Sequence, residues 1–163
     1  MKPEKVIRGK YVLIVDDEKD VLDTLTELLD MCRLDTALSF EEAKKLLEEN
    51  KYDLAVLDIM GVNGYELLNI ANSRKIPALM LTAHALSSDN LKRSAEEGAA
   101  YYAPKEKIED IATFMADVFE SIDAGKSPWE KLFDRLGGFY DKQFHGTDWR
   151  EQREEYLEKS KYW

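Results

Sequence analysis

One stretch near the N-terminus decides the fold: Tyr11-Val12-Leu13-Ile14-Val15-Asp16-Asp17, an unbroken apolar run followed at once by two carboxylates. A continuous run of Val, Ile and Leu suits a strand buried on both faces, and such strands belong to parallel sheets covered by helices. The run Leu54–Leu57 ends in the same way at Asp58. Carboxyl ends of parallel strands meet at one edge of a sheet, where ligands bind in open α/β folds. We therefore expect Asp16, Asp17 and Asp58 to form an acidic pocket for a cation.

Apolar runs and helical stripes alternate along the rest of the chain. After the first strand, the pattern predicts four more strands: one near Leu34–Leu38, then Asp53–Leu57, Ala78–Leu81 and Ala100–Tyr102. A helix is predicted after each strand: one through Leu25 and Leu29, one capped by Ser39, one that Gly64 opens, one over Ser87–Glu97 and one from Ile108 to Ile122. Glu42 is the expected capping-box partner of Ser39. These repeated β-α units predict a doubly wound α/β fold that ends near Asp123.

Composition excludes several classes of function. The chain has 163 residues and a net charge of −10, the wrong sign for binding a phosphate backbone, and it has no Lys/Arg-rich stripe, so no nucleic-acid partner is expected. Cys32 is its single cysteine, which excludes an intrachain disulfide and a multi-cysteine zinc site. No long apolar segment suggests a signal peptide or a membrane span, so we expect a cytoplasmic protein without a membrane partner.

Five positions, taken together, resemble the receiver domain of response regulators: Asp16-Asp17, Asp58, Thr82 after Ala78–Leu81, and Lys105 after Gly98–Tyr102. They fall in the family's order at four strand ends, and the resemblance covers about residues 8–123. It implies a flavodoxin-like fold with a five-stranded parallel sheet in the order 2-1-3-4-5. It also implies a phosphoacceptor of a two-component phosphorelay. Such a protein takes its phosphoryl group from a histidine kinase or phosphotransfer protein and signals to a downstream protein, here unknown, through protein contacts.

The resemblance implies which residues bind the metal and accept the phosphoryl group. Asp58 would be the phosphoacceptor, and Mg²⁺ would be bound directly by Asp17 and Asp58, through water by Asp16, and by the backbone carbonyl of Met60. A cation suits this chemistry, because phosphoryl transfer to a carboxylate brings two anions together. Apart from its own phosphorylation and dephosphorylation, the chain is not expected to be an enzyme.

The resemblance also implies roles for three residues around the phosphoryl group. Lys105 would pair with the phosphoryl oxygens, and the Thr82 hydroxyl would donate to one of them. Tyr102 is at the aromatic switch position, where the ring rotates into space that the threonine vacates.

The chain departs from the family at two positions near the pocket. The loop Ile59–Asn63 is shorter than usual and lacks the usual Met-Pro, which affects the placement of the Met60 carbonyl. Glu106 follows Lys105 where most receivers have a proline in a cis peptide, so a trans peptide is expected here. These departures leave open a pseudo-receiver that binds partners without being phosphorylated. A Mg²⁺-dependent hydrolase is a further alternative, although no second acid follows two residues after Asp58.

Residues 124–163 are expected to form a helical C-terminal extension. Ser127-Pro128-Trp129-Glu130 has a cap, a proline at the first helical position and a glutamate that reaches back. The stripe that follows is interrupted by Gly137-Gly138, and a second cap is expected at Asp148. Acidic and basic residues balance in residues 126–163, so a DNA-binding output module is not expected.

Three apolar residues of this extension, Trp129, Phe133 and Leu136, share one helical face that must be buried. They are predicted to dock on the receiver, with Phe114 as a possible contact whose ring lies on the flank of its helix and is not fully inside. A homodimer contact and the docking of another partner are the alternatives.

Overall fold

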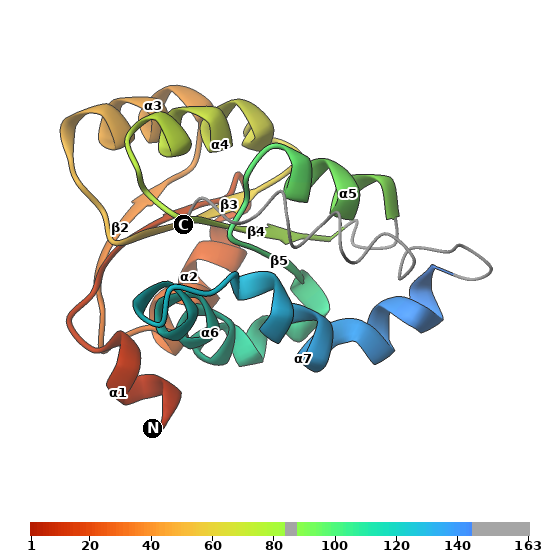
Figure 1. The fold of residues 1–163 in the computed structure, drawn as a ribbon. Helices are drawn as coiled ribbons and strands as arrows, with labels where there is room; N and C mark the ends of the chain where they lie inside the picture. The colour runs from red at the N-terminus through yellow and green to blue at the C-terminus, as the bar shows by residue number, and fades with distance from the viewer. Residues whose placement is uncertain (84–87, 145–163) are drawn as a thin grey trace.

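The computed structural model describes residues 1–83 and 88–144 and contains a five-stranded sheet with helices on both faces (Figure 1). Its strands are β1 (Tyr11–Val15), β2 (Arg33–Ala37), β3 (Leu54–Asp58), β4 (Ala78–Thr82) and β5 (Tyr101–Pro104). They run parallel in the order β2-β1-β3-β4-β5. The predicted doubly wound α/β fold is therefore confirmed.

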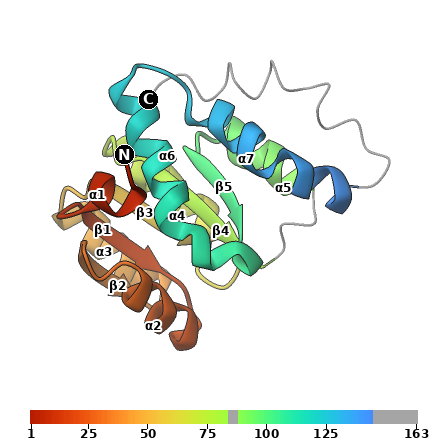
Figure 2. The same cartoon turned by 90° about the horizontal axis from the view of Figure 1, so that it is seen from below.

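Helices form a layer on each side of this sheet (Figures 1 and 2). One layer contains α3 (Phe40–Glu49), α4 (Gly64–Ser73) and α5 (Ser88–Glu96), and the other contains α2 (Lys19–Leu28) and α6 (Ile111–Asp123). The predicted capping box is present at the start of α3, where Ser39 Oγ accepts from the Glu42 N–H at 3.2 Å and Glu42 Oε1 accepts from the Leu38 N–H at 2.9 Å. None of the described helices is long and apolar enough to cross a membrane.

The central strands are buried along their whole length, as an unbroken apolar run requires. Their register sets the positions of the residues that follow the apolar runs. Val15 pairs with Leu57, so Asp16 and Asp58 lie side by side, each one residue further on. Asp58 pairs with Leu81, and Thr82 pairs with Pro104, which precedes Lys105. The four polar side chains are therefore brought to one edge of the sheet.

Two short helices were not predicted. The helix α1 (Pro3–Ile7) packs on α6 and buries Ile7 completely. A 3-10 helix, η1 (Lys105–Asp110), precedes α6. The α-helix that was expected to begin at Ile108 therefore begins at Ile111. A six-residue turn and a five-residue helix are too short to show a clear periodicity in sequence.

The extension forms a helix, α7 (Pro128–Gln143), alongside α6 and next to β5 (Figure 2). It begins as predicted, with Ser127 Oγ accepting from the Trp129 N–H at 3.2 Å. The glycines Gly137-Gly138, which interrupt the apolar stripe, do not end the helix, because α7 continues through both. Packing of the apolar face against α6 and β5 outweighs the low helix propensity of glycine. The predicted cap at Asp148 lies outside the described residues.

Candidate functional site

Two buried carboxylates and one lysine meet at the carboxyl edge of the sheet. Asp16 follows β1, Asp58 ends β3 and Lys105 follows β5. The Lys105 Nζ lies 2.7 Å from Asp16 Oδ2 and 3.1 Å from Asp58 Oδ1. Asp16 is 2% exposed and Asp58 is 5% exposed. The ammonium group thus bridges two acids that come from different strands and lie away from bulk water.

Burial and mutual repulsion determine the charge states in this pocket. The pKa of Asp58 is raised to about 6, because burial and the negative charge of Asp16 both raise it and Lys105 only partly opposes them. For Lys105, burial lowers the pKa, but its hydrogen bonds and charge attraction to Asp16 and Asp58 outweigh burial, so the pKa is raised. The pocket therefore holds a charged lysine beside carboxylates that a second cation would stabilise.

Asp17 lies at the exposed rim of the same pocket. Oxygens from Asp16, Asp17 and Glu18 all lie within 4.8 Å of one another and could hold a metal ion. The Glu18 N–H donates to Asp16 Oδ1 at 2.9 Å, which orients that carboxylate. Sequence reasoning did not single out Glu18, because its place in the pocket depends on the turn between β1 and α2. Asp58 is outside this group of oxygens and is joined to it by Lys105.

The short loop after β3 turns tightly against the pocket. Gly61 has a φ of +80°, and a Cβ at this position would lie 2.4 Å from Asp17 Oδ2. A Cβ at Gly64 would lie 2.1 Å from the backbone oxygen of Asp58. The loop therefore needs glycine at both positions. Gly61 is required by its positive φ and by its contact with Asp17, and Gly64 is required by its contact with the Asp58 backbone alone. The Met60 side chain is 57% exposed, and the role of its carbonyl as a metal ligand stays a prediction.

The two predicted switch residues lie on adjacent strands behind the pocket. Thr82 ends β4 and Tyr102 lies in β5, and both are buried. Burial raises the pKa of the Tyr102 phenol, and its hydroxyl has no hydrogen-bond partner among the described residues. Its backbone oxygen accepts from the Tyr140 hydroxyl of α7 at 2.8 Å. Tyr102 therefore joins the strand that leads to Lys105 with the C-terminal helix.

The peptide between Lys105 and Glu106 is trans, as expected, and the described residues contain no cis peptide bond. Lys105 nevertheless reaches both acids without the proline that usually follows it.

The three apolar residues predicted to dock lie against the chain's own receiver. Trp129 is completely buried and its indole N–H donates to the Ala99 carbonyl at 2.8 Å, while Phe133 and Leu136 are also buried. Phe114 differs from expectation: it is only 1% exposed, and its ring stacks on Tyr101 with 5.5 Å between centroids. The sequence placed this ring on the flank of α6, but α7 lies along that helix and closes the flank.

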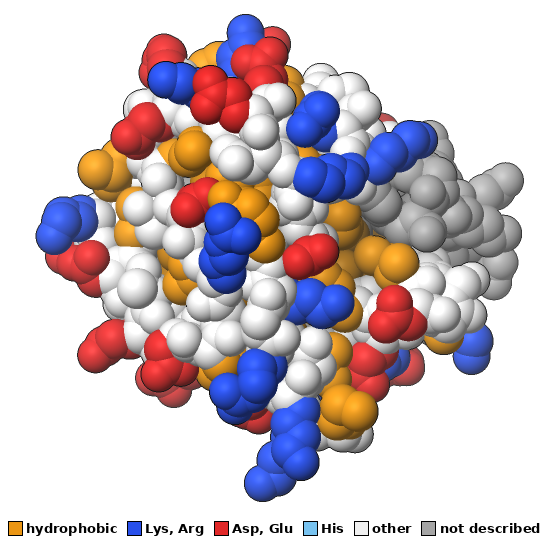
Figure 3. All heavy atoms as spheres, turned by 90° about the vertical axis from the view of Figure 1, so that its left-hand side faces the viewer, with side chains coloured by type: hydrophobic (Ala, Val, Ile, Leu, Met, Phe, Trp, Pro, Cys, Tyr) orange, Lys and Arg blue, Asp and Glu red, His pale blue; other side chains and the backbone are white. Residues whose placement is uncertain are grey.

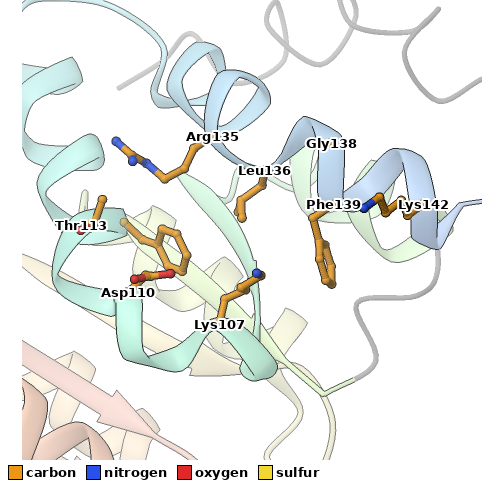
Figure 4. Close-up of a pocket in the computed structure, with 9 residues that line it drawn as sticks. Lys107, Asp110, Thr113, Arg135, Leu136, Gly138, Phe139 and Lys142 are labelled. Atoms are coloured by element: carbon orange, nitrogen blue, oxygen red, sulfur yellow. The ribbon is translucent and has the colours of Figure 1, made fainter.

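A groove of about 470 Å³ lies between α7 and the segment formed by η1 and α6, away from the acidic pocket (Figure 4). Apolar side chains, among them Leu136 and Phe139, line it together with Lys107 and Arg135. On the face in Figure 3, acidic and basic side chains are interspersed and do not form a basic stripe.

Comparison with known proteins agrees with this geometry. The family model described as the response regulator receiver domain matches residues 12–115. The heme response regulator HssR of Staphylococcus aureus (strain Newman) is 39% identical over 98 residues. That match spans 57% of this chain but only 43% of the relative, less than half of its length.

Solved receiver structures show the same fold. The BeF3-activated DrrB receiver domain is 26% identical, with a TM-score of 0.61 over 69% of this chain and 98% of that one. A CheY-like receiver domain protein from Methanospirillum hungatei is 25% identical, with a TM-score of 0.55 over 83% of this chain and 96% of that one. The family match covers more than half of the chain, including the residues of the acidic pocket and the sheet apart from the first residue of β1, so the chain belongs to the response-regulator receiver domain family of two-component signalling.

Proposed function

We propose that this receiver accepts a phosphoryl group on Asp58 from a histidine kinase or phosphotransfer protein and signals through protein contacts in the cytoplasm. One observation carries the proposal: the Lys105 ammonium lies 3.1 Å from Asp58 Oδ1 and 2.7 Å from Asp16 Oδ2 inside a buried pocket. Such a lysine can pair with the free Asp58 carboxylate before the reaction and with the oxygens of a phosphoryl group on Asp58 afterwards.

The reaction needs little covalent chemistry from the protein. An Asp58 carboxylate oxygen forms a bond to phosphorus, the bond from phosphorus to the leaving group breaks, and its electron pair stays on the leaving group. That group is an imidazole nitrogen of a donor histidine or an oxygen of a small acyl phosphate. Lys105 would neutralise charge on the transferred oxygens, and Thr82, at the end of β4, would donate a hydrogen bond to one of them.

The residues of the pocket fit a magnesium ion. Their donors are carboxylates, which Mg²⁺ prefers, and the Asp58 pKa is raised in part by Asp16, a repulsion that a bound cation relieves. Asp16, Asp17, Asp58 and the Met60 carbonyl would hold the ion. When bound, it would supply positive charge to the phosphoryl oxygens.

Mass spectrometry of the intact protein tests this proposal. Incubation with acetyl phosphate and MgCl₂ should add the mass of one phosphoryl group, and chelation of Mg²⁺ by EDTA should prevent the addition. The matched variant Asp58→Asn keeps the size of the side chain and should gain no mass. Labelling of Asp58→Asn would overturn the assignment of the acceptor. Absence of labelling in the unmodified chain, from acetyl phosphate and from a phosphorylated histidine donor alike, would favour a pseudo-receiver.

A further inference from the structure

The first half of α7 is held on the receiver by polar contacts as well as by apolar packing. The Trp129 indole N–H donates to the Ala99 carbonyl at 2.8 Å. Arg135 donates two hydrogen bonds to the Asp117 carboxylate, at 2.7 and 3.0 Å, and the same carboxylate accepts from the Tyr101 hydroxyl at 2.8 Å. Asp117 is buried, so removal of Arg135 would leave its charge without this partner. The segment Pro128–Leu136 is therefore firmly anchored.

The second half of α7, Phe139–Gln143 with its cap Phe144, contacts the residues next to the proposed phosphorylation site. The Tyr140 hydroxyl donates to the Tyr102 carbonyl at 2.8 Å, and the two rings lie 5.8 Å apart. Phe144 stacks on Tyr140 with 5.2 Å between centroids. Lys107, in the η1 turn that begins at Lys105, places its Nζ 5.7 Å from the centre of the Phe139 ring, and both side chains point into the groove (Figure 4).

Two glycines, Gly137 and Gly138, join these halves and weaken the helix between them. Glycine weakens a helix interior because it loses more backbone entropy than any other residue when the helix forms. A Cβ at Gly138 would meet nothing within 4 Å, so packing does not require glycine there. Gly138 also lines the groove of about 470 Å³ between α7 and the receiver. The second half of α7 therefore has both a weak joint and open space beside it.

The Tyr102 side chain, beneath this second half, makes no hydrogen bond with the residues that the structure describes. Tyr102 is completely buried and its hydroxyl has no partner among the described residues. An unpaired buried hydroxyl costs free energy, which the protein regains if the ring moves to a place where the hydroxyl can bind. Movement of the Tyr102 ring would disturb the neighbouring ring of Tyr140, whose centroid lies 5.8 Å away, and so the placement of the Tyr140 hydroxyl that donates to the Tyr102 backbone oxygen.

From these contacts we infer that Phe139–Phe144 is a phosphorylation-controlled latch on the receiver. Phosphorylation of Asp58 moves Tyr102, the Tyr140–Tyr102 contact opens, and the segment after Gly138 leaves the receiver while Pro128–Leu136 stays bound. The aromatic face of Tyr140 and Phe144 then becomes accessible to other proteins. This inference rests on the proposed phosphorylation of Asp58 and names how that event is transmitted.

Hydrogen–deuterium exchange of the full chain tests the latch. After incubation with acetyl phosphate and MgCl₂, backbone amides in residues 139–144 should exchange about tenfold faster, whereas those in residues 130–136 should not change. Asp58→Asn, treated in the same way, should show no increase. If mass spectrometry shows phosphorylated Asp58 but residues 139–144 exchange as before, the latch is wrong and the proposed function stands. Equal acceleration across all of α7 would also overturn it, because the whole helix would then be released.

Two variants outside the phosphorylation site test the joint and the contact. Gly138→Ala should leave labelling of Asp58 intact and reduce the phosphorylation-dependent increase in exchange several-fold, because alanine stabilises the helix at the joint. Tyr140→Phe keeps the ring and removes only the hydroxyl, and should speed basal exchange in residues 139–144 alone. Unchanged basal exchange in Tyr140→Phe would show that its hydrogen bond does not hold the segment, which contradicts the latch even if Asp58 is never labelled.

Discussion

The acidic pocket and the α7 interface are both buried, yet they are built on different principles. The pocket consists of residues that end strands, so the register of the sheet alone brings Asp16, Asp58 and Lys105 together. The α7 interface joins residues far apart in sequence, such as Trp129 with Ala99 and Arg135 with Asp117. The pocket holds buried acids whose charges Lys105 offsets only in part, whereas the interface pairs its charges and hydrogen bonds. We expect substitutions in the pocket to act through charge and close contacts, and substitutions in the interface to act through lost packing and lost hydrogen bonds.

The largest effect is expected at Trp129. Trp129→Ala removes a completely buried ring and leaves the Ala99 carbonyl without its indole donor. The loss should lower the free energy of unfolding by about 3–5 kcal/mol, which urea denaturation of the full chain would measure. Trp129→Phe retains most of the apolar surface and should cost clearly less. An alanine variant as stable as the parent chain would show that α7 contributes no stability to the receiver.

The second-largest effect is expected from replacing a glycine by alanine in the loop beside the pocket, compared with the same replacement in α7. Gly64→Ala places a Cβ 2.1 Å from the Asp58 backbone oxygen, so the loop beside the phosphoacceptor must move, at a cost of about 1–3 kcal/mol. Gly138→Ala introduces the same methyl group into open space in α7 and should be neutral or stabilising by up to about 1 kcal/mol. Thermal melts of both variants measure the difference. The same sign for both would mean that the loop adapts more easily than its close contacts indicate.

The comparison also explains how much the sequence could predict. The unbroken runs at Val12–Val15 and Leu54–Leu57 specify buried parallel strands, so the sheet and the position of Asp16 and Asp58 follow from local pattern and topology. Register then places Thr82 and Lys105 at the same edge. Glu18 could not be predicted, because its backbone N–H orients Asp16 only through the geometry of one turn.

Contacts between distant surfaces left no comparable signal in the sequence. An apolar stripe predicted that Trp129, Phe133 and Leu136 dock on the receiver, but it did not identify the Ala99 carbonyl as the partner of Trp129. Phe114 was misplaced because its burial depends on the path of α7 and on stacking with Tyr101. Asp117 looked like an ordinary helix acid until the structure paired it with Arg135 and Tyr101. The continuation of α7 through Gly137-Gly138 likewise depends on packing, which overrides local propensity.

The third prediction concerns the cost of holding Asp58 charged in the pocket, through burial and repulsion from Asp16, measured without metal. Because the Asp58 pKa is raised to about 6, the folded chain keeps a proton that the unfolded chain releases at lower pH. The stability that this group provides is therefore present below the unfolded pKa and is lost as pH rises through about 6. In EDTA at pH above this range, Asp58→Asn should be more stable than the parent chain by about 1–3 kcal/mol.

Two controls define this pH effect. The advantage of Asp58→Asn should shrink as pH falls below the unfolded pKa, where both side chains are neutral, and MgCl₂ should reduce it at neutral pH by stabilising the parent chain. Thermal midpoints measured at several pH values with EDTA and with MgCl₂ provide the comparison. An advantage that does not vary with pH would mean that the acidic pocket is not under electrostatic strain.

The smallest effect is expected at Tyr140, where the two regions meet. Tyr140→Phe removes the hydroxyl that donates to the Tyr102 carbonyl and leaves the stacked rings in place. Loss of one buried hydrogen bond should cost about 1 kcal/mol, and Tyr101→Phe, which removes a hydrogen bond to the charged Asp117, should cost more.

If Tyr140 reports the state of Tyr102, its substitution should also change the rate at which acetyl phosphate labels Asp58, because coupling between two sites acts in both directions. Tyr101→Phe should leave that rate unchanged. Equal labelling rates in the parent chain and both variants, at the expected loss of stability, would mean that α7 is a structural support with no connection to the phosphorylation site.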